Sequence, residues 1–379
     1  MSAPQPLVSV VMVVRDFERF VGEAIESILR QTFTDFEFVI LDFGSTDRSK
    51  AIASAYAARD HRIRLHYANC DLVEARNIAC SIATARYIAI QDADDVCLPD
   101  RLLRQVEFMQ KHADCALLGS AAEWTDAQGT SLFTLDFPTE HDEIRSALVA
   151  RCAFSHTSVL MRREAFIAVG GYRKAFALAH DYDLFLRISE RFQCANLKEV
   201  LVKYRLHLQQ SSVSKRDQQI LCALAARASA ACRKNALLDP LNSADTVTPN
   251  LLAALGVTPA EIQTSRFRGC RRWVSNAIAA KDYSTAIQIA VTTRKSEWEY
   301  VEPRDIAFLH RILAGLYWRN GQFRKSLSAA YHGISLAMDR DLAGDVLRRI
   351  WEYAGVHSKA AAPKLTGASR LFGRQRDAN

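Results

Sequence analysis

The chain has 379 residues, of which 49% are hydrophobic, so it is long enough for two domains and a sizeable core. Its net charge of +7 is uneven: residues 1–215 carry 25 Lys and Arg against 28 Asp and Glu, whereas residues 216–379 carry 24 against 14. No apolar run approaches the length of a membrane span, about 20 residues, and the first residues lack a signal-peptide pattern. The nine cysteines show no zinc-type spacing. We therefore expect a cytoplasmic protein with reduced thiols.

Strand and helix patterns alternate through the first 112 residues. Continuous apolar runs predict buried strands, and apolar residues at helical spacing predict the helices between them. We expect strands at 7–14, 36–41, 62–68 and 86–91, and helices at 18–31, from about 47, at 72–85 and at 98–112. Ser45 or Thr46 is expected to cap the helix that begins near Asp47. This alternation predicts an α/β fold with a mostly parallel twisted sheet flanked by helices.

Polar residues follow the expected strands at their carboxyl ends, where open α/β sheets bind ligands. The positions are Arg15 and Asp16, Asp42 and Phe43, the segment after Tyr67, and the run from Asp92 to Asp95.

The acidic run "QDADD" is the strongest local signal. Asp92, Asp94 and Asp95 repel one another unless a positive charge lies among them, and Mg²⁺ or Mn²⁺ bridging protein carboxylates and a substrate phosphate would supply it. The alternative is a solvated acidic turn in which Asp95 or Asp100 caps the next helix.

Three classes of nucleotide-binding protein are excluded by sequence context. Asp42-Phe43-Gly44 has the letters of a kinase metal motif, but the chain lacks a His-Arg-Asp tripeptide and has only Gly22 before this point. Neither a dinucleotide G-x-G-x-x-G nor a Walker lysine loop follows the first strand. A phosphate would therefore be held by metal and side chains. Arg76, in the first turns of a helix, is the candidate, with a surface arginine as the alternative.

Two acids lie two residues apart near the start of another expected helix, in "HDYD". Asp181 and Asp183 need not point the same way, so one can be a general base while the other caps the helix. The preceding Gly170-Gly171 suits either a backbone close to a sugar or a helix C-cap.

Residues 7 to about 214 resemble an inverting family 2 glycosyltransferase with the GT-A fold. The resemblance rests on five ordered stretches: "VSVVMVVRDFERFVGEAIESILRQTFTDFEFVILDFGSTDRS", "EARN", "YIAIQDADDVCLPDRL", "VLMRREAFIAVGGYRKAFALAHDYDLFLRIS" and "VKYRLHLQQSSVS".

The resemblance implies a site for a nucleotide-sugar, a metal ion and a catalytic base. It implies contact with the nucleotide-sugar for Val13, Arg15, Asp42, Phe43, Arg76, Asp92 and Asp94. It implies Mg²⁺ or Mn²⁺ near Asp94, Asp95 and His207, and it matches Asp181 to the general base.

Four positions depart from the family pattern. Arg15 stands where an aromatic residue commonly packs on the base, and Phe43 replaces the second acid of the nucleotide-pocket turn. Asp71 stands for a glycine, and His180 for an acid. Since the metal residues and the base are kept, these departures indicate an altered donor preference.

The expected catalytic domain covers residues 1–215, with a nucleotide-sugar half at 1–100 and an acceptor half at 101–215. Residues 216–250 are read as a helix and a polar linker, 251–357 as a helical region, and 358–379 as a basic disordered tail. Tyr283 and Phe323 recur 40 residues apart, as in tetratricopeptide-type hairpins, with a plain helical bundle as the alternative.

The predicted function is metal-dependent inverting transfer of a sugar to a hydroxyl of a glycan, lipid-linked or protein acceptor. The basic C-terminal region suggests an anionic membrane surface, a polyanionic glycan or an acidic protein as partner, with peripheral binding at the inner membrane face left open. No nucleic-acid motif is present. One rival is a degenerate nucleotide-binding domain with a helical protein-interaction module. Another is a nucleotidyltransferase, which should carry a basic glycine loop near the first strand.

Overall fold

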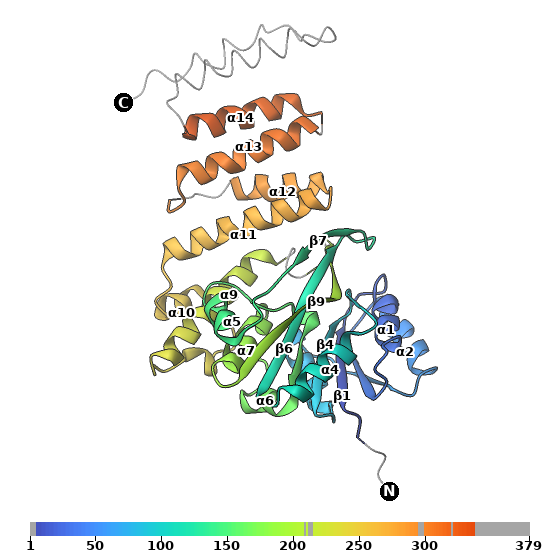
Figure 1. Ribbon diagram of the computed structural model, residues 1–379. Helices are drawn as coiled ribbons and strands as arrows, with labels where there is room; N and C mark the ends of the chain where they lie inside the picture. Colours follow the sequence, from blue (N-terminus) through green and yellow to red (C-terminus); the bar gives the residue numbers. More distant parts are fainter. Residues whose placement is uncertain (1–4, 208–209, 211–214, 295–298, 320, 338–379) are drawn as a thin grey trace, which may run out of the picture. The chain divides into compact units, whose positions relative to one another are not determined.

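The computed structural model describes residues 5–207, 210, 215–294, 299–319 and 321–337 (Figure 1). The chain divides into two compact units, Met1–Lys281 and Asp282–Asn379. The expected basic tail at 358–379 and the last part of the expected helical region lie outside the described residues.

The first 111 residues alternate strand and helix as predicted. The elements are β1 (Val8–Val14), α1 (Val21–Leu29), β2 (Phe36–Asp42), α2 (Ser49–Ala57), β3 (Ile63–Tyr67), α3 (Leu72–Ile82), β4 (Tyr87–Asp92), β5 (Val96–Cys97) and α4 (Arg101–Lys111). Strands β3, β2, β1 and β4 pair side by side and parallel, which confirms the expected parallel sheet in this half.

The second half of the sheet is mixed. Its elements are β6 (Cys115–Thr125), β7 (Ser131–Leu135), α5 (His141–Leu148), η1 (His156–Ser158), β8 (Leu160–Arg162), α6 (Arg163–Ala168), α7 (His180–Ser189) and β9 (Gln193–Arg205). The strand order is β3-β2-β1-β4-β8-β6-β9-β5, with β7 paired to β6. Strand β8 runs antiparallel to β4 and β6, and β9 runs parallel to β6.

Strand register brings the expected polar positions to one edge of the sheet. Val13 of β1 lies opposite Leu41 of β2 and Asp92 of β4, and Val14 lies opposite Asp42. The short strand β5 pairs antiparallel with the end of β9, so the turn after Asp92 lies beside residues more than 100 positions later in the chain.

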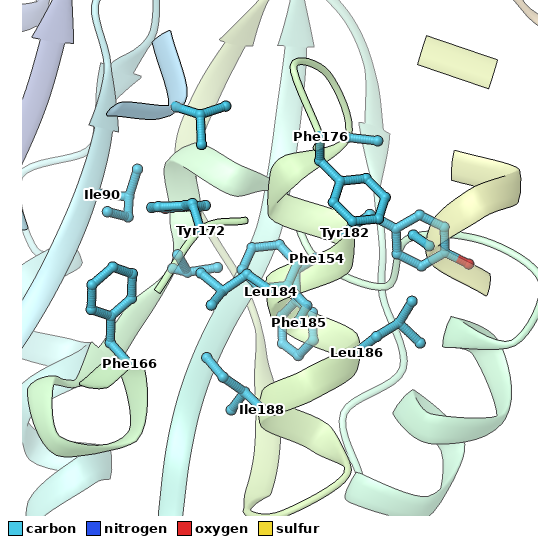
Figure 2. Close-up of a cluster of buried hydrophobic side chains, with 14 of the residues drawn as sticks. Ile90, Phe154, Phe166, Tyr172, Phe176, Tyr182, Leu184, Phe185, Leu186 and Ile188 are labelled. Carbon is cyan, nitrogen blue, oxygen red and sulfur yellow. The ribbon is translucent and has the colours of Figure 1, made fainter. Parts of the chain in front are cut away.

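Alternate strand residues enter two separate cores, one on each face of the sheet. Val11 and Val13 of β1 join a core with helices α3, α5 and α7, whereas Val10, Met12 and Val14 join a core with α1, α2 and α4. Figure 2 shows the first core, with Phe154 packed beside the α7 residues Leu184 and Phe185. This burial fixes α7 against the sheet.

The predicted cap of the second helix is wrong. Ser45 Oγ accepts the backbone N–H of Asp16, and both the N–H and the hydroxyl of Thr46 donate to Asp16 Oδ1. Helix α2 starts at Ser49, whose N–H donates to Asp47 Oδ1. Asp16 can reach the turn because its backbone is left-handed, with φ 59°.

The first compact unit continues past the expected boundary at residue 215. It contains α9 (Arg216–Lys234), η2 (Pro240–Asn242), α10 (Pro249–Ala254) and α11 (Pro259–Ala279). Leu224 of α9 and Leu241 of η2 are buried in the same core as α7. Asp239, in the expected polar linker, is 5% exposed and pairs with Arg173, which also binds Asp183 of α7. Charge pairing and apolar burial thus tie this segment to α7.

The described part of the second unit is helical, with α12 (Tyr283–Arg294), α13 (Pro303–Arg319) and α14 (Phe323–Ala337). Tyr283 and Phe323 each begin a helix. Two residues before each of them the backbone is left-handed, at Lys281 with φ 57° and at Gly321 with φ 68°. The same backbone conformation therefore recurs before both helices, 40 residues apart. The tetratricopeptide assignment stays a prediction. Among the helices of the described residues, none has the length and apolarity to cross a membrane.

Gly119 of β6 is predicted to be essential for packing. An added Cβ would lie 2.1 Å from Asn196 Oδ1 and 2.7 Å from Phe154 Cδ1. Asn196 cannot easily move, because its Nδ2 donates to Pro138 O and Ala153 O. Gly119→Ala is expected to lower the free energy of unfolding by about 1–3 kcal/mol, measured by urea denaturation.

Gly22→Ala is the matched control, since its added Cβ would come no closer than 3.7 Å to another atom, Tyr56 Oη. In helix α1 it should be neutral or stabilise by up to about 1 kcal/mol. Equal urea midpoints for Gly119→Ala and the wild type would show that Asn196 yields freely.

Candidate active site

Asp92 ends β4 within a group of positive side chains. Arg76 Nη2, on α3, donates to Asp92 Oδ1 at 2.9 Å, and His156 Nδ1, on η1, lies 3.0 Å from Asp92 Oδ2. Burial alone would raise the pKa of Asp92, but His156 and Arg76 outweigh it and hold this pKa well below the usual value. Asp92 therefore stays ionised although it is largely buried.

Asp94 and His207 meet across the β5–β9 pairing. His207 Nε2 lies 2.9 Å from Asp94 Oδ2, and its ring packs on Phe20 with centroids 4.7 Å apart. Arg205, 4% exposed, donates from Nε to Asp94 O and from Nη2 to Glu23 Oε2. Arg205 thus braces the backbone that carries Asp94.

Asp95 points into the fold. It is 1% exposed, and its Oδ1 accepts the backbone N–H of Arg205 at 2.8 Å. Burial, reinforced by the negative charges of Asp94 and Asp92, raises the pKa of Asp95 well above the usual value. Neither Asp95 nor Asp100 caps α4 through its side chain, so the alternative of a simple capping turn does not hold.

A buried arginine supports the acidic turn from behind. Arg101 is fully buried and donates to Ile90 O, Val159 O and Gln91 Oε1. Gln91 Nε2 in turn donates to the carbonyl oxygens of Asp92 and Asp95. Arg101 is therefore joined to the backbone of the acidic turn through one amide, that of Gln91.

The expected nucleotide pocket lies at the ends of β1 and β2. Asp42 is 3% exposed; its Oδ1 accepts the N–H groups of Gly44 and Ser45, while its buried Oδ2 has no hydrogen-bond partner among the described residues. Phe43 is 9% exposed, and the Arg15 guanidinium lies 5.8 Å from its ring centroid. Val13 is buried beneath this edge.

The structure distinguishes the two acids at the start of α7. Asp183 is fully buried and pairs with both Arg173 and Arg187. Asp181 is half-buried, and its carboxylate accepts no hydrogen bond from the described residues. It lies close enough to Arg76 and Tyr172 for its charge to act on the pKa values of both. Asp183 thus has a structural role in pairing two arginines, whereas Asp181 has no such role among the described residues.

The structure brings Arg76 to Asp92 and His207 to Asp94, as expected for one site at the strand ends. Sequence reasoning missed His156, Tyr172 and Arg205. The strings "SHTS" and "GGYR" carry no spacing that indicates a site, and Arg205 was visible only as part of "YRLH".

A divalent cation is compatible with this site. The described residues contain no group of three His, Cys, Asp or Glu side chains close enough to hold a metal by themselves. Asp94 and His207 offer a carboxylate oxygen and an imidazole nitrogen side by side, and the buried Nδ1 of His207 has no hydrogen-bond partner among the described residues. Mg²⁺ and Mn²⁺ sites commonly combine one or two protein ligands with substrate phosphate and water, so the pair fits.

Comparison with known proteins agrees with this geometry. Residues 9–170 match the family model described as "Glycosyl transferase family 2". The chain is 35% identical to the putative glycosyltransferase EpsE of Bacillus subtilis over 206 residues, covering 53% of this chain and 73% of EpsE. It is 30% identical to the O-antigen biosynthesis glycosyltransferase WbnJ of Escherichia coli over 207 residues, covering 53% of this chain and 80% of WbnJ.

Among solved structures, residues 1–349 of S. aureus TarS in complex with UDP-GlcNAc align with a TM-score of 0.51 and 13% identity, covering 86% of this chain and 90% of that one. This likeness supports the fold alone. With a relative at 35% identity matched over 73% of its length, and with the acidic strand ends described above, the chain belongs to the family 2 glycosyltransferases and is a glycosyltransferase of GT-A fold.

Proposed function

We propose that the protein is a metal-dependent, inverting glycosyltransferase that moves a sugar from a nucleotide-diphospho-sugar to a hydroxyl acceptor. The observation that carries this proposal is the division of roles among the acids. Asp94 has His207 as its side-chain partner, and Asp181 has no hydrogen-bond partner among the described residues, whereas Asp92, Asp95 and Asp183 are occupied within the fold.

Asp94 and His207 would hold the cation, with Asp95 behind them in the turn. The bound cation would neutralise negative charge that develops on the departing diphosphate. Arg76, already charged and buried next to Asp92, would add a second positive group near that diphosphate.

Asp181 would accept the proton of the acceptor hydroxyl. As this O–H bond breaks, the acceptor oxygen forms a bond to the anomeric carbon, and the bond from that carbon to the diphosphate oxygen breaks with its electron pair leaving on the diphosphate. Attack on the face opposite to the leaving group inverts the anomeric centre. Asp181 lies in the first turn of α7.

Surface polysaccharide, a lipid-linked glycan or a glycoprotein is the proposed product class. Support comes from WbnJ, which is described as an O-antigen biosynthesis enzyme. The proposed place of action is the cytoplasm, including the inner face of the membrane. A thermal-shift screen of nucleotide-sugars with Mn²⁺ would identify the donor. Metal-dependent nucleotide binding without hydrolysis or transfer would favour the degenerate binding domain instead.

Asp181→Asn is expected to lower donor turnover by about 10²–10⁴-fold, because an amide cannot take up the acceptor proton. Release of nucleoside diphosphate measures turnover. Binding of UDP or GDP with Mn²⁺, measured by calorimetry, should stay near the wild-type value. Unchanged turnover would remove Asp181 from the mechanism.

Asp183→Asn is the matched control on the same helical turn. It leaves Arg173 and Arg187 without their shared buried anion, so the free energy of unfolding should fall by about 3–5 kcal/mol in urea denaturation. If Asp181→Asn instead caused the large loss of stability, Asp181 would be the structural acid and Asp183 the candidate base.

Metal removal is expected to abolish turnover. EDTA should stop release of nucleoside diphosphate, and added Mn²⁺ or Mg²⁺ should restore it in the wild type but not at the same concentration in Asp94→Asn. Asp114→Asn, on an exposed loop, should behave like the wild type. Full activity in EDTA would show that the reaction needs no metal.

Phe43→Asp is expected to change the preference among UDP, GDP and dTDP. An acid here could accept a hydrogen bond from a base N–H and would face Arg15, whereas a phenyl ring only stacks or packs. Phe43→Leu, which stays apolar, should keep the wild-type ranking. If calorimetry ranks the three nucleotides alike in Phe43→Asp and the wild type, Phe43 serves packing alone.

A further inference from the structure

Five residues close a ring of hydrogen bonds inside the catalytic unit. Arg76 Nη2 donates to Asp92 Oδ1 at 2.9 Å, and His156 Nδ1 lies 3.0 Å from Asp92 Oδ2. His156 Nε2 lies 3.1 Å from the Tyr172 hydroxyl. Asn77, next to Arg76 on α3, donates to Tyr172 O at 2.8 Å and accepts from Tyr172 N at 2.9 Å. The ring therefore returns to the helix on which it begins.

The hydrogen bonds of the ring use both nitrogens of His156. Carboxylate oxygens accept hydrogen bonds, so His156 Nδ1 donates in the bond to Asp92. On the other side of the imidazole, Nε2 shares a hydrogen bond with the Tyr172 hydroxyl. Burial raises the pKa of Tyr172 well above its usual value, so the hydroxyl keeps its proton. His156 is thus hydrogen-bonded at both ring nitrogens, to Asp92 on one side and to Tyr172 on the other.

The ring connects the two halves of the catalytic domain. Arg76, Asn77 and Asp92 come from the nucleotide-sugar half, whereas His156 and Tyr172 come from the acceptor half. Tyr172 is 3% exposed and belongs to the hydrophobic core drawn in Figure 2. Its position is therefore fixed by packing as well as by hydrogen bonds.

The ring also reaches the residue before Asp181. His180 packs edge-on against His156, with ring centroids 5.7 Å apart, and against Tyr172 at 5.4 Å. Burial, with the positive charges of Arg76 and His156, lowers the pKa of His180 well below its usual value, so its ring is neutral. The start of α7 is thus held against the ring by an uncharged aromatic contact.

We propose that His156 is a positioning residue that fixes Asp181 relative to Arg76 during sugar transfer. This inference rests on the proposed function. In-line displacement needs the base and the leaving diphosphate on opposite sides of one carbon. Asp181 lies on α7, whereas Arg76, which would contact the diphosphate, lies on α3. A shift of about 1 Å between them can cost about 10²-fold in rate. Through Asp92 and Tyr172, His156 is the link that sets this spacing.

A double-mutant cycle on turnover tests the link. His156→Asn keeps an N–H donor where Nδ1 serves Asp92 but loses the reach to Tyr172, and Tyr172→Phe removes the hydroxyl of the same bond. Each is expected to lower turnover about tenfold to a hundredfold. The double variant should be no slower than the single variants, because all three lack the same hydrogen bond between His156 and Tyr172. The substrate is whichever of UDP-GlcNAc, UDP-glucose and GDP-mannose the wild type hydrolyses fastest with Mn²⁺.

Nucleotide binding separates positioning from a general loss of structure. Calorimetry with UDP or GDP and Mn²⁺ should give dissociation constants within about threefold of the wild type for His156→Asn and Tyr172→Phe, a fall in kcat without a fall in affinity. Tyr182→Phe is the matched control, since it removes another buried tyrosine hydroxyl, bonded to Leu148 O outside the ring. Its turnover should stay within about twofold of the wild type.

Three results would overturn the proposal: wild-type turnover in either single variant, additive losses in the double variant, or an equal loss in Tyr182→Phe. A wild-type protein that binds and hydrolyses none of the nucleotides would instead contradict the proposed function.

Discussion

Repulsion among three carboxylates at the end of β4 is the constraint on which this site depends. The sequence places Asp92, Asp94 and Asp95 within four residues, and without opposing charge they would not remain together in a buried turn. Each acid is accommodated differently. Asp92 is hydrogen-bonded by Arg76 and His156, and Asp94 by the imidazole of His207. Asp95 accepts a backbone N–H, and burial raises its pKa well above the usual value. The groups responsible are the side chains of Arg76, His156 and His207 and the backbone N–H of Arg205.

These stabilising groups come from distant parts of the chain, so the sheet topology is what assembles the site. Strand β9 ends beside β5, which brings Arg205 and His207 to an acidic turn more than 100 residues earlier. Insertion of β8 between β4 and β6 places η1, and with it His156, at the end of β4. Strand β8, antiparallel to β4, begins at the carboxyl edge of the parallel half, and β9, parallel to β6, ends there, so both bring the chain back to that edge.

Local pattern was sufficient to predict the alternating strands and helices and the acidic strand ends, because burial on both faces leaves a continuous apolar run. It could not tell Asp181 from Asp183, since their difference lies in Arg173 and Arg187 and not in the acids. Ser45 and Thr46 looked like helix caps, but both bind Asp16, about 30 residues earlier in the chain. Ser45 Oγ accepts the backbone N–H of Asp16, and the Thr46 hydroxyl donates to its carboxylate. His156 and Tyr172 were missed because a closed ring across four segments leaves no spacing to recognise.

The attachment of α9 and η2 to α7 has a consequence for how this protein can be divided. Arg173 is shared between two acids: Asp183, on the helix that carries the proposed base, and Asp239, which lies beyond the end of the family resemblance at about residue 214. A fragment trimmed to the part of the chain that resembles the family would leave Arg173 without Asp239 and expose the apolar side of α7. The enzyme has thus incorporated the beginning of its own extension into the catalytic fold, and a minimal catalytic fragment should extend to residue 281.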